Sequence, residues 1–393
     1  MKQLFLFLSI SLFFVGCKSY KAYFNQEFEE VIETPFKFKL DNNKILCTVC
    51  DDSSSYELLF DTGVSITTFF NENVLKNLKV YGDKTVHLAL KNAEITVKKG
   101  TLNLDYAFLN ISNNSVAYQI IELKDSSCYN SNLDGIIGMD IFTFLEGDTC
   151  KYILDLKFSD STITIYDTLP RLKKLESYTN LKSKFYLGKH PMIYLKIKGY
   201  EDSIKFLFDT GFDYSMIIND EKIYEKINKD SLVRMNELKK IESKSGYKEK
   251  LLNSDMFITD VKLLNGENLK TPVIFSEDFS KNILGLQFIK QYDWVIDFIN
   301  KEVYFKKHEV ISDNQNLHAS FYNMSYFVAK EKDILYISRI NENYTKYKLG
   351  AIIKSVNGTL VTQENICEMK SLVNSKPGEV VVEFEENFIE EAK

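Results

Sequence analysis

Short apolar runs alternate with clusters of Asn, Asp, Ser and Gly over residues 23–167. This punctuation predicts β-strands joined by turns. Residues 85–100 (TVHLALKNAEITVKKG) also alternate apolar and polar positions with period two, and the alternation breaks at Lys91-Asn92. Such a pattern is typical of a hairpin. We therefore expect a first lobe rich in β-structure over residues 23–167.

A second lobe is expected over residues 185–307, because the same order of elements returns there. A pair of apolar strands leads into a helical stretch near residues 219–228 and then into the polar section KKIESKSGYKEKLLNSDMFI. This section predicts an exposed hairpin with its tip near Ser245-Gly246. A charged connector over residues 168–184 is expected to link the two lobes.

The tetrapeptide Phe-Asp-Thr-Gly occurs twice, at residues 60–63 and 208–211. Its acids, Asp61 and Asp209, are 148 residues apart, and each follows an apolar run. At average residue usage, two copies with matching flanks are far rarer than one chance Asp-Thr-Gly. The repeat therefore indicates a duplicated unit that carries an acid.

Two further landmarks recur downstream of each acid. An apolar-apolar-Gly segment contains Gly138 in the first half and Gly285 in the second, 77 and 76 residues after the respective acid. Strand pairs of similar pattern then follow over residues 152–166 and 294–305. Landmarks that recur in one order indicate a structural repeat.

The apolar runs before the two acids also restrict what the acids can do. Residues 58–60 and 206–208 suit buried strands, where an unpaired charge costs several kcal/mol. Two carboxyl groups that meet within hydrogen-bonding distance can share one proton and titrate as a unit. We therefore expect Asp61 and Asp209 to face one another in one catalytic site.

Residues 30 to 307 resemble the retropepsin-like and pepsin-like aspartic proteases in the twin Phe-Asp-Thr-Gly and its downstream landmarks. The resemblance implies a mainly β fold, in which two similar β-barrel lobes form a pseudo-dimer within a monomer. It implies catalytic roles for Asp61 and Asp209, and no metal or cofactor. It also implies that threonines hydrogen-bond across the dyad and that glycines let the backbone pass close to the partner lobe. These supporting residues are Thr62, Gly63, Thr210 and Gly211.

The character of the chain changes after His308. Residues 318–393 contain KLGAIIKSVNG, a predicted helix near residues 363–373 and a final apolar strand. KLGAIIKSVNG resembles the strand and turn of PDZ domains, which implies a small α+β module. Ala351 stands where that family usually has Asp, and the nearest candidate for a carboxylate-binding loop is residues 323–327. We therefore predict a folded PDZ-like module and leave peptide binding by it open.

Residues 1–17 (MKQLFLFLSISLFFVGC) have the basic-then-apolar order of a secretory signal. The apolar stretch is too short to span a bilayer as an ordinary helix. Its end resembles the lipobox of bacterial lipoproteins, although Phe14 is unusual there, and this resemblance implies lipid on Cys17. We expect export across the inner membrane and a lipid anchor in the cell envelope. An ordinary cleaved signal is the alternative. Position 18 holds Lys instead of the Asp that would resemble an inner-membrane retention signal, which favours the outer membrane.

Composition narrows the remaining functions. The 393 residues are 45% hydrophobic and 13% aromatic, enough for a large core. The formal net charge of −6 provides no basic surface for nucleic acid. His87, His190, His308 and His318 lie far apart in the sequence, which argues against a zinc site or a Ser-His-Asp triad.

The cysteines form no clear motif. Cys47 and Cys50 make a C-x-x-C within a predicted strand, with no second copy and no nearby His. We interpret them as small apolar residues of that strand instead of metal or redox ligands. With Cys17 lipidated, an odd number remains, so at least one stays unpaired within the chain.

The leading interpretation is an aspartic endopeptidase that hydrolyses peptide or protein substrates. A water activated between Asp61 and Asp209 would attack the peptide bond. The alternative is a catalytically inactive peptide-binding lipoprotein with the same lobes and module. It is motivated by Val64 and Phe212, which follow the glycines where small residues are usual, and by the lack of a clear Gly-rich flap in the first lobe. A third reading is a scaffold that acts through its PDZ-like end.

Overall fold

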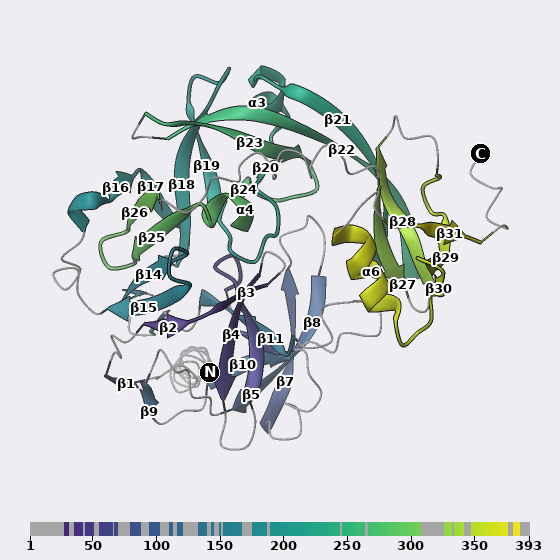
Figure 1. The fold of residues 1–393 in the computed structure, drawn as a ribbon. Coiled ribbons are helices and arrows are strands. Elements are labelled where there is room, and N and C mark those ends of the chain that lie inside the picture. Colours follow the sequence, from purple (N-terminus) through teal and green to yellow (C-terminus); the bar gives the residue numbers. More distant parts are fainter. Residues whose placement is uncertain are drawn as a thin grey trace, which may run out of the picture.

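The computed structural model shows a mainly β chain, with two lobes placed one above the other in Figure 1. The structure describes residues 27–30, 35–41, 44–50, 55–65, 67–69, 79–87, 94–102, 110–112, 116–120, 133–139, 143–144, 149–150, 152–166, 175–186, 189–243, 246–263, 266–307, 326–331, 334–341, 347–375 and 380–385. The expected signal segment with Cys17 lies outside these residues.

The first lobe is built on an eight-stranded sheet, drawn in purple and blue in Figure 1. Across the sheet the strands follow the order β3 (Lys39–Asp41), β4 (Lys44–Cys50), β5 (Ser55–Phe60), β11 (Gly135–Ile137), β6 (Thr68–Phe69), β10 (Val116–Ile120), β8 (Glu94–Leu102) and β7 (Lys79–His87). β5 pairs antiparallel with β4 and parallel with β11. Because its Leu58, Leu59 and Phe60 are all buried, β5 reads as a continuous apolar run without alternation.

The second lobe repeats this arrangement in teal and green. Its strands follow the order β17 (Ser183–Tyr186), β18 (His190–Ile197), β19 (Ser203–Phe208), β24 (Ile283–Leu284), β20 (Met216–Ile218), β23 (Asn268–Phe275), β22 (Gly246–Lys262) and β21 (Asp230–Ser243). β19 pairs antiparallel with β18 and parallel with β24. The strand order therefore matches that of the first lobe position by position.

Each lobe ends in a long hairpin, as the sequence predicts. β7 pairs antiparallel with β8 in the first lobe, and β21 pairs antiparallel with β22 in the second. Ser243 faces Gly246 at the end of the second hairpin, so its tip lies where it was expected. The turns themselves, residues 88–93 and 244–245, fall outside the described residues.

A six-stranded sheet joins the lobes on the left of Figure 1. Its order is β16 (Thr179–Leu181), β26 (Glu302–Lys307), β25 (Tyr292–Asp297), β14 (Ile153–Lys157), β15 (Thr162–Tyr166) and β2 (Phe36–Lys37). The antiparallel pair β14 and β25 forms the middle of the sheet, so each half of the chain contributes a hairpin to it. β16 and the start of β17 fall within residues 168–184, so the end of the expected connector is part of two sheets.

One apolar core runs through both lobes and the six-stranded sheet. Trp294 of β25 lies edge-on to Phe208 of β19, with ring centroids 4.9 Å apart. The indole N–H of Trp294 donates to the carbonyl of Ile289 at 2.7 Å, which satisfies its polar atom in the core. The strand that ends at Asp209 is therefore fixed against the sheet that joins the lobes.

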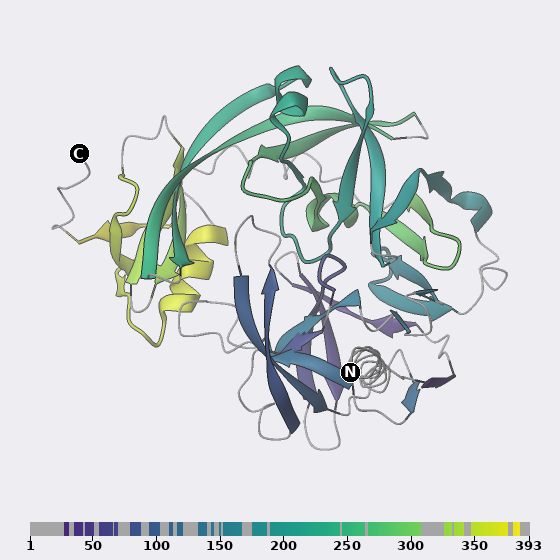
Figure 2. The same ribbon diagram turned by 180° about the vertical axis from the view of Figure 1, so that it is seen from behind.

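The C-terminal unit, yellow-green in Figures 1 and 2, has a core of its own. It contains β27 (Tyr326–Glu331), β28 (Ile334–Asn341), β29 (Ile352–Val356), β30 (Thr359–Leu360), α6 (Ile366–Ser375) and β31 (Val382–Phe384). β28 pairs antiparallel with β21 of the second lobe, from Met235 with Asn341 to Glu237 with Arg339. The sheet of the second lobe thus continues into the C-terminal unit.

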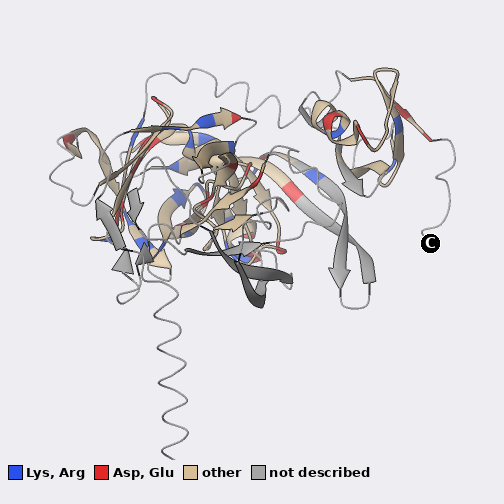
Figure 3. Cartoon of the chain, turned by 90° about the horizontal axis from the view of Figure 1, so that it is seen from below, with Lys and Arg blue, Asp and Glu red and all other residues tan. Residues whose placement is uncertain are grey.

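The remaining elements are short. They are β1 (Glu27–Glu30) with β9 (Asn110–Ser112), β12 (Thr143–Phe144) with β13 (Thr149–Cys150), the 3-10 helix η3 (Leu175–Ser177), α3 (Glu221–Lys226) and α4 (Leu286–Ile289). α3 lies within the expected helical stretch, and Asp220 caps it by accepting from the amide of Lys222 at 2.9 Å. Basic and acidic residues are interspersed along the described ribbon (Figure 3). Within the described ranges, no helix has the length and apolar character needed to cross a membrane.

Candidate active site

The two acids stand at equivalent places in the two lobes. Asp61 follows β5 and Asp209 follows β19, the strands that run parallel to β11 and β24. The amide of Asp61 donates to Ile137 at 3.0 Å, and the amide of Asp209 donates to Leu284 at 3.0 Å. Each acid is therefore held where its buried strand leaves the sheet and turns.

The structure brings these two acids together. Their carboxyl groups hydrogen-bond to each other. A β-carbon built on Gly63 would lie 2.5 Å from Oδ2 of Asp209, and one built on Gly211 would lie closer still to Oδ2 of Asp61. Glycine is required at both positions because the backbone of each loop passes against the carboxyl group of the other lobe.

Burial governs the titration of the pair, since Asp61 is 8% exposed and Asp209 is 9% exposed. Loss of water raises the pKa of Asp61, and amide donors such as that of Gly63, 2.7 Å from Oδ1, oppose this rise. Burial also raises the pKa of Asp209 well above its usual range, and the neighbouring charge of Asp61 adds to the effect. Two such acids cannot both ionise cheaply, so the pair holds one proton between them.

Thr62 and Thr210 bind the two loops to each other. The amide of Thr62 donates to Oγ1 of Thr210 at 3.0 Å, and the amide of Thr210 donates to Oγ1 of Thr62 at 3.1 Å. The hydroxyl of Thr62 donates to the carbonyl of Phe208 at 2.7 Å, and that of Thr210 donates to the carbonyl of Phe60 at 2.8 Å. These four symmetric bonds between fully buried groups hold the acids in register.

His190, which was not predicted from the sequence as a site residue, lies beside the first loop. Its Nδ1 is 3.0 Å from the carbonyl oxygen of Thr62, and its Nε2 is 2.8 Å from Oγ of Ser65. In the sequence the histidines were weighed only for a zinc site or a Ser-His-Asp triad, so this contact of His190 was not predicted. Its place at the start of the strand before the second acid was the available signal.

The second loop has different surroundings. Asp213 lies two residues after Gly211, at the place that Ser65 occupies in the first loop. Asp213 is exposed as a whole residue, but desolvation of its carboxyl group raises its pKa to about 6, and the charge of Asp61 adds to this rise. The positive charge of Lys44 opposes this rise.

Phe212 packs within its own lobe. Its ring lies 5.4 Å from that of Tyr214 and 5.9 Å from that of Phe279, measured between centroids. These contacts anchor Phe212 to an apolar cluster of the second lobe. Phe212, one of the two bulky residues that motivated the catalytically inactive alternative, is therefore engaged in packing.

The other chemical candidates lie apart from the acids. Cys47 is a buried thiol whose pKa is raised by burial, Cys50 is exposed, and neither forms a disulfide. Cys367 of the C-terminal unit is disulfide-bonded. In the described part of the chain, no group of three or more His, Cys, Asp or Glu side chains is arranged to hold a metal ion.

No protein-family model matches the chain, and a search of curated proteins finds no match.

Proposed function

We propose that the chain is an aspartic endopeptidase that hydrolyses peptide bonds with a water activated between Asp61 and Asp209. One observation carries the proposal: two buried carboxyl groups from equivalent strand ends hydrogen-bond to each other across the junction of the lobes. A pair of acids that shares one proton provides a base and an acid at neighbouring positions.

The chemistry follows from that single proton. The ionised carboxylate takes a proton from the water as the oxygen of that water attacks the peptide carbonyl carbon. The protonated partner donates to the carbonyl oxygen, which forms a tetrahedral diol. The acid that took the proton from the water then passes it to the peptide nitrogen, while one hydroxyl of the diol returns its proton to the other acid. The carbonyl re-forms, the C–N bond breaks, and an amine and a carboxylic acid are released, with one proton again held by the pair. The raised pKa values of both acids favour the state with one proton.

The proposal extends to the architecture that the sequence resembles. The matching strand orders support reading the lobes as retropepsin-like halves of one pseudo-dimer. The strands and helix of residues 326–385 support reading the C-terminal unit as a PDZ-like module. A lipid anchor on Cys17 would hold the protein in the cell envelope, and it rests on the sequence of the first 17 residues.

Cleavage of a peptide library by the protein without residues 1–17 tests the proposal. Product masses should be followed from acidic to neutral pH. Asp61→Asn and Asp209→Asn should each abolish cleavage, because Asn neither accepts nor supplies the proton. Asp202→Asn is a matched control, since this exposed acid lies in the turn between β18 and β19.

Three results separate the alternatives. Cleavage that a pepstatin-type inhibitor blocks and that both acid variants lack supports the proposal. Cleavage that survives both substitutions contradicts it. A protein that binds library peptides but leaves them intact is the peptide-binding lipoprotein of the alternative interpretation.

A further inference from the structure

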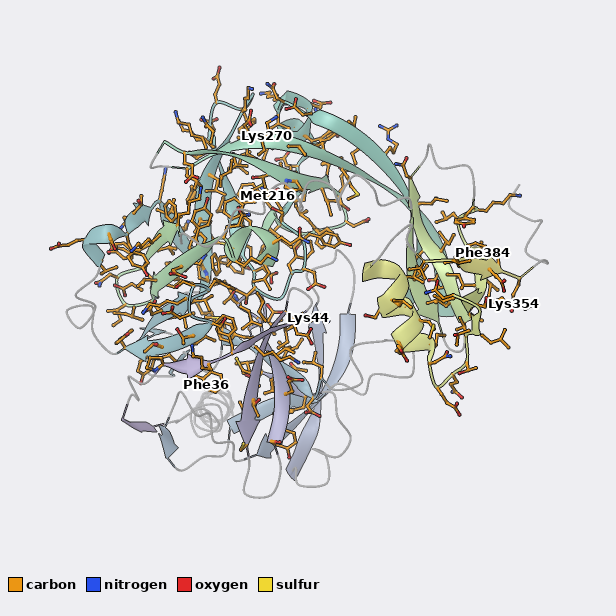
Figure 4. All side chains as sticks on the ribbon, in the orientation of Figure 1. Phe36, Lys44, Met216, Lys270, Lys354 and Phe384 are labelled. Atoms are coloured by element: carbon orange, nitrogen blue, oxygen red, sulfur yellow. The ribbon has the colours of Figure 1, made fainter. Side chains whose placement is uncertain are left out.

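Lys44 and His190 occupy equivalent positions in the two lobes. Lys44 begins β4 and His190 begins β18, the strands that precede each acid-bearing strand. Extending the observed registers by two residues sets Lys44 opposite Asp61 and His190 opposite Asp209. Each lobe therefore places one basic residue at the side of its own acid, near the junction of the lobes, where Figure 4 labels Lys44.

Both residues interact with the other lobe. His190 of the second lobe contacts Ser65 of the first, and Lys44 of the first lobe acts through its charge on Asp213 of the second. Ser65 and Asp213 are themselves equivalent, because each lies two residues after the glycine of its loop. The two halves thus have related cross-lobe pairs of different chemistry, one with a hydrogen bond and the other with opposite charges.

The geometry fixes which nitrogen of a neutral His190 carries the hydrogen. The carbonyl oxygen of Thr62 can only accept, so Nδ1 must carry the hydrogen that joins them at 3.0 Å. In the neutral ring Nε2 then has no hydrogen and accepts from the hydroxyl of Ser65 at 2.8 Å. One imidazole therefore holds two points of the first loop.

The surroundings of His190 disfavour its protonation. The residue is 3% exposed. Burial lowers the pKa of His190, the charges of Lys189 and Lys281 lower it further, and the bond to Thr62 opposes them. The ring of Tyr186 lies 6.5 Å from that of His190, measured between centroids, and Nζ of Lys281 lies 3.6 Å from the centroid of the Tyr186 ring. Lys189 and Lys281 are thus the charges that act on the imidazole, and the acid pair, with Asp209 opposite His190 in the extended register, is the titratable group on its other side.

We propose that His190 is a positioning residue that holds the first catalytic loop from the second lobe through Thr62 and Ser65, and that it does so as a neutral imidazole. The proposal rests on the endopeptidase function. Protonation would give the ring a second hydrogen, on Nε2. It would turn the Ser65 hydroxyl from donor to acceptor and add a positive charge beside Thr62. The bonded arrangement and the position of Asp61 would then change together.

Kinetics of variants test the role. His190→Ala and Ser65→Ala should each lower kcat by roughly tenfold to a hundredfold, the cost of a small misplacement of a catalytic group, with little change in KM. The double variant should be little worse than His190→Ala alone, because that substitution already removes the bond to Ser65. Lys196→Ala on the exposed side of β18 is the control and should match the parent.

The pH profile provides a readout that a purely structural role would not move. His190→Asn can keep the donor to Thr62 but cannot titrate, so its activity should persist to lower pH than that of the parent. Additive effects of the two alanine substitutions, or a His190→Asn profile with an unchanged acid side, would overturn the proposal.

A measurement without catalysis separates this proposal from the function on which it rests. Hydrogen exchange of residues 61–65 should rise in folded His190→Ala and in the parent once His190 is protonated. Unchanged exchange in both refutes the positioning role, whether or not the protein cleaves peptides. Increased exchange in a protein without peptidase activity would refute the proposed function but still support the contact of His190 with the first loop.

Discussion

Replacing Thr62 by Val measures how strongly the threonine bonds hold the lobes together. Val keeps the shape of the side chain but removes its hydroxyl, so the carbonyl of Phe208 and the amide of Thr210 lose their partner. Each buried group left unpaired costs about 1–3 kcal/mol. We therefore expect the free energy of unfolding to fall by about 2–6 kcal/mol through the loss of both bonds. Thr210→Val removes the other two bonds and should cost the same.

Urea unfolding followed by tryptophan fluorescence measures the loss of unfolding free energy. Trp294, the single Trp of the chain, is a suitable probe because it packs against Phe208 in the strand that leads to Asp209. Thr62→Ser keeps the hydroxyl and should cost about 1 kcal/mol for the lost methyl group. Thr259→Val is the matched control, because the buried hydroxyl of Thr259 bonds to none of the described residues. A loss below about 1 kcal/mol in Thr62→Val, or an equal loss in Thr259→Val, would refute the reasoning.

Three other predictions concern Asp209, the close approach at Gly63 and the N-terminal cysteine. Asp209→Asn should be inactive yet melt at a higher temperature than the parent at neutral pH. Because the pKa of Asp209 is raised in the folded protein, its contribution to stability is complete below the unfolded value of 3.8 and is lost as pH rises through the folded pKa. The melting temperatures of the parent and of Asp209→Asn should therefore converge as pH falls toward 3.8. A difference that widens there would contradict this. Gly63→Ala should abolish peptide cleavage, because its methyl group would meet the carboxyl group of Asp209. The control Gly266→Ala has open space around the added methyl group but a φ of +86°, so it should cost about 1 kcal/mol of stability and leave cleavage intact. Equal cleavage by both variants would count against the close approach. Cys17→Ala should prevent incorporation of labelled palmitate in a bacterial host and release the protein from membranes, and labelling that persists would exclude lipid on Cys17.

Several features could be predicted from the sequence because they depend on local pattern. The apolar runs with polar turns predicted a mainly β chain, which the structure confirms. The hairpin with its tip near residue 245 and the helix expected near residues 363–373 are also present, although α6 begins at Ile366 and ends at Ser375. The twin tetrapeptide identified the two acids, since an acid after a buried strand is visible without any knowledge of the fold.

Other features depend on contacts between distant residues and had no local signal. The pairing of β28 with β21 joins the C-terminal unit to the second lobe through backbone groups, which any sequence of strand character can provide. The connector contains charged residues typical of a linker, yet its end forms β16 beside β26. Such edge pairing is decided by which strands meet in space.

The sequence by itself determined that the chain carries two equivalent acids, each at the end of a buried strand and followed by a glycine. The tertiary structure alone decided that Asp61 and Asp209 meet, that their burial raises both pKa values and that His190 lies against the first loop. The physical reason is distance. Proton sharing and desolvation act over a few ångströms between groups separated by more than a hundred residues, and only the packing of one lobe on the other brings them that close.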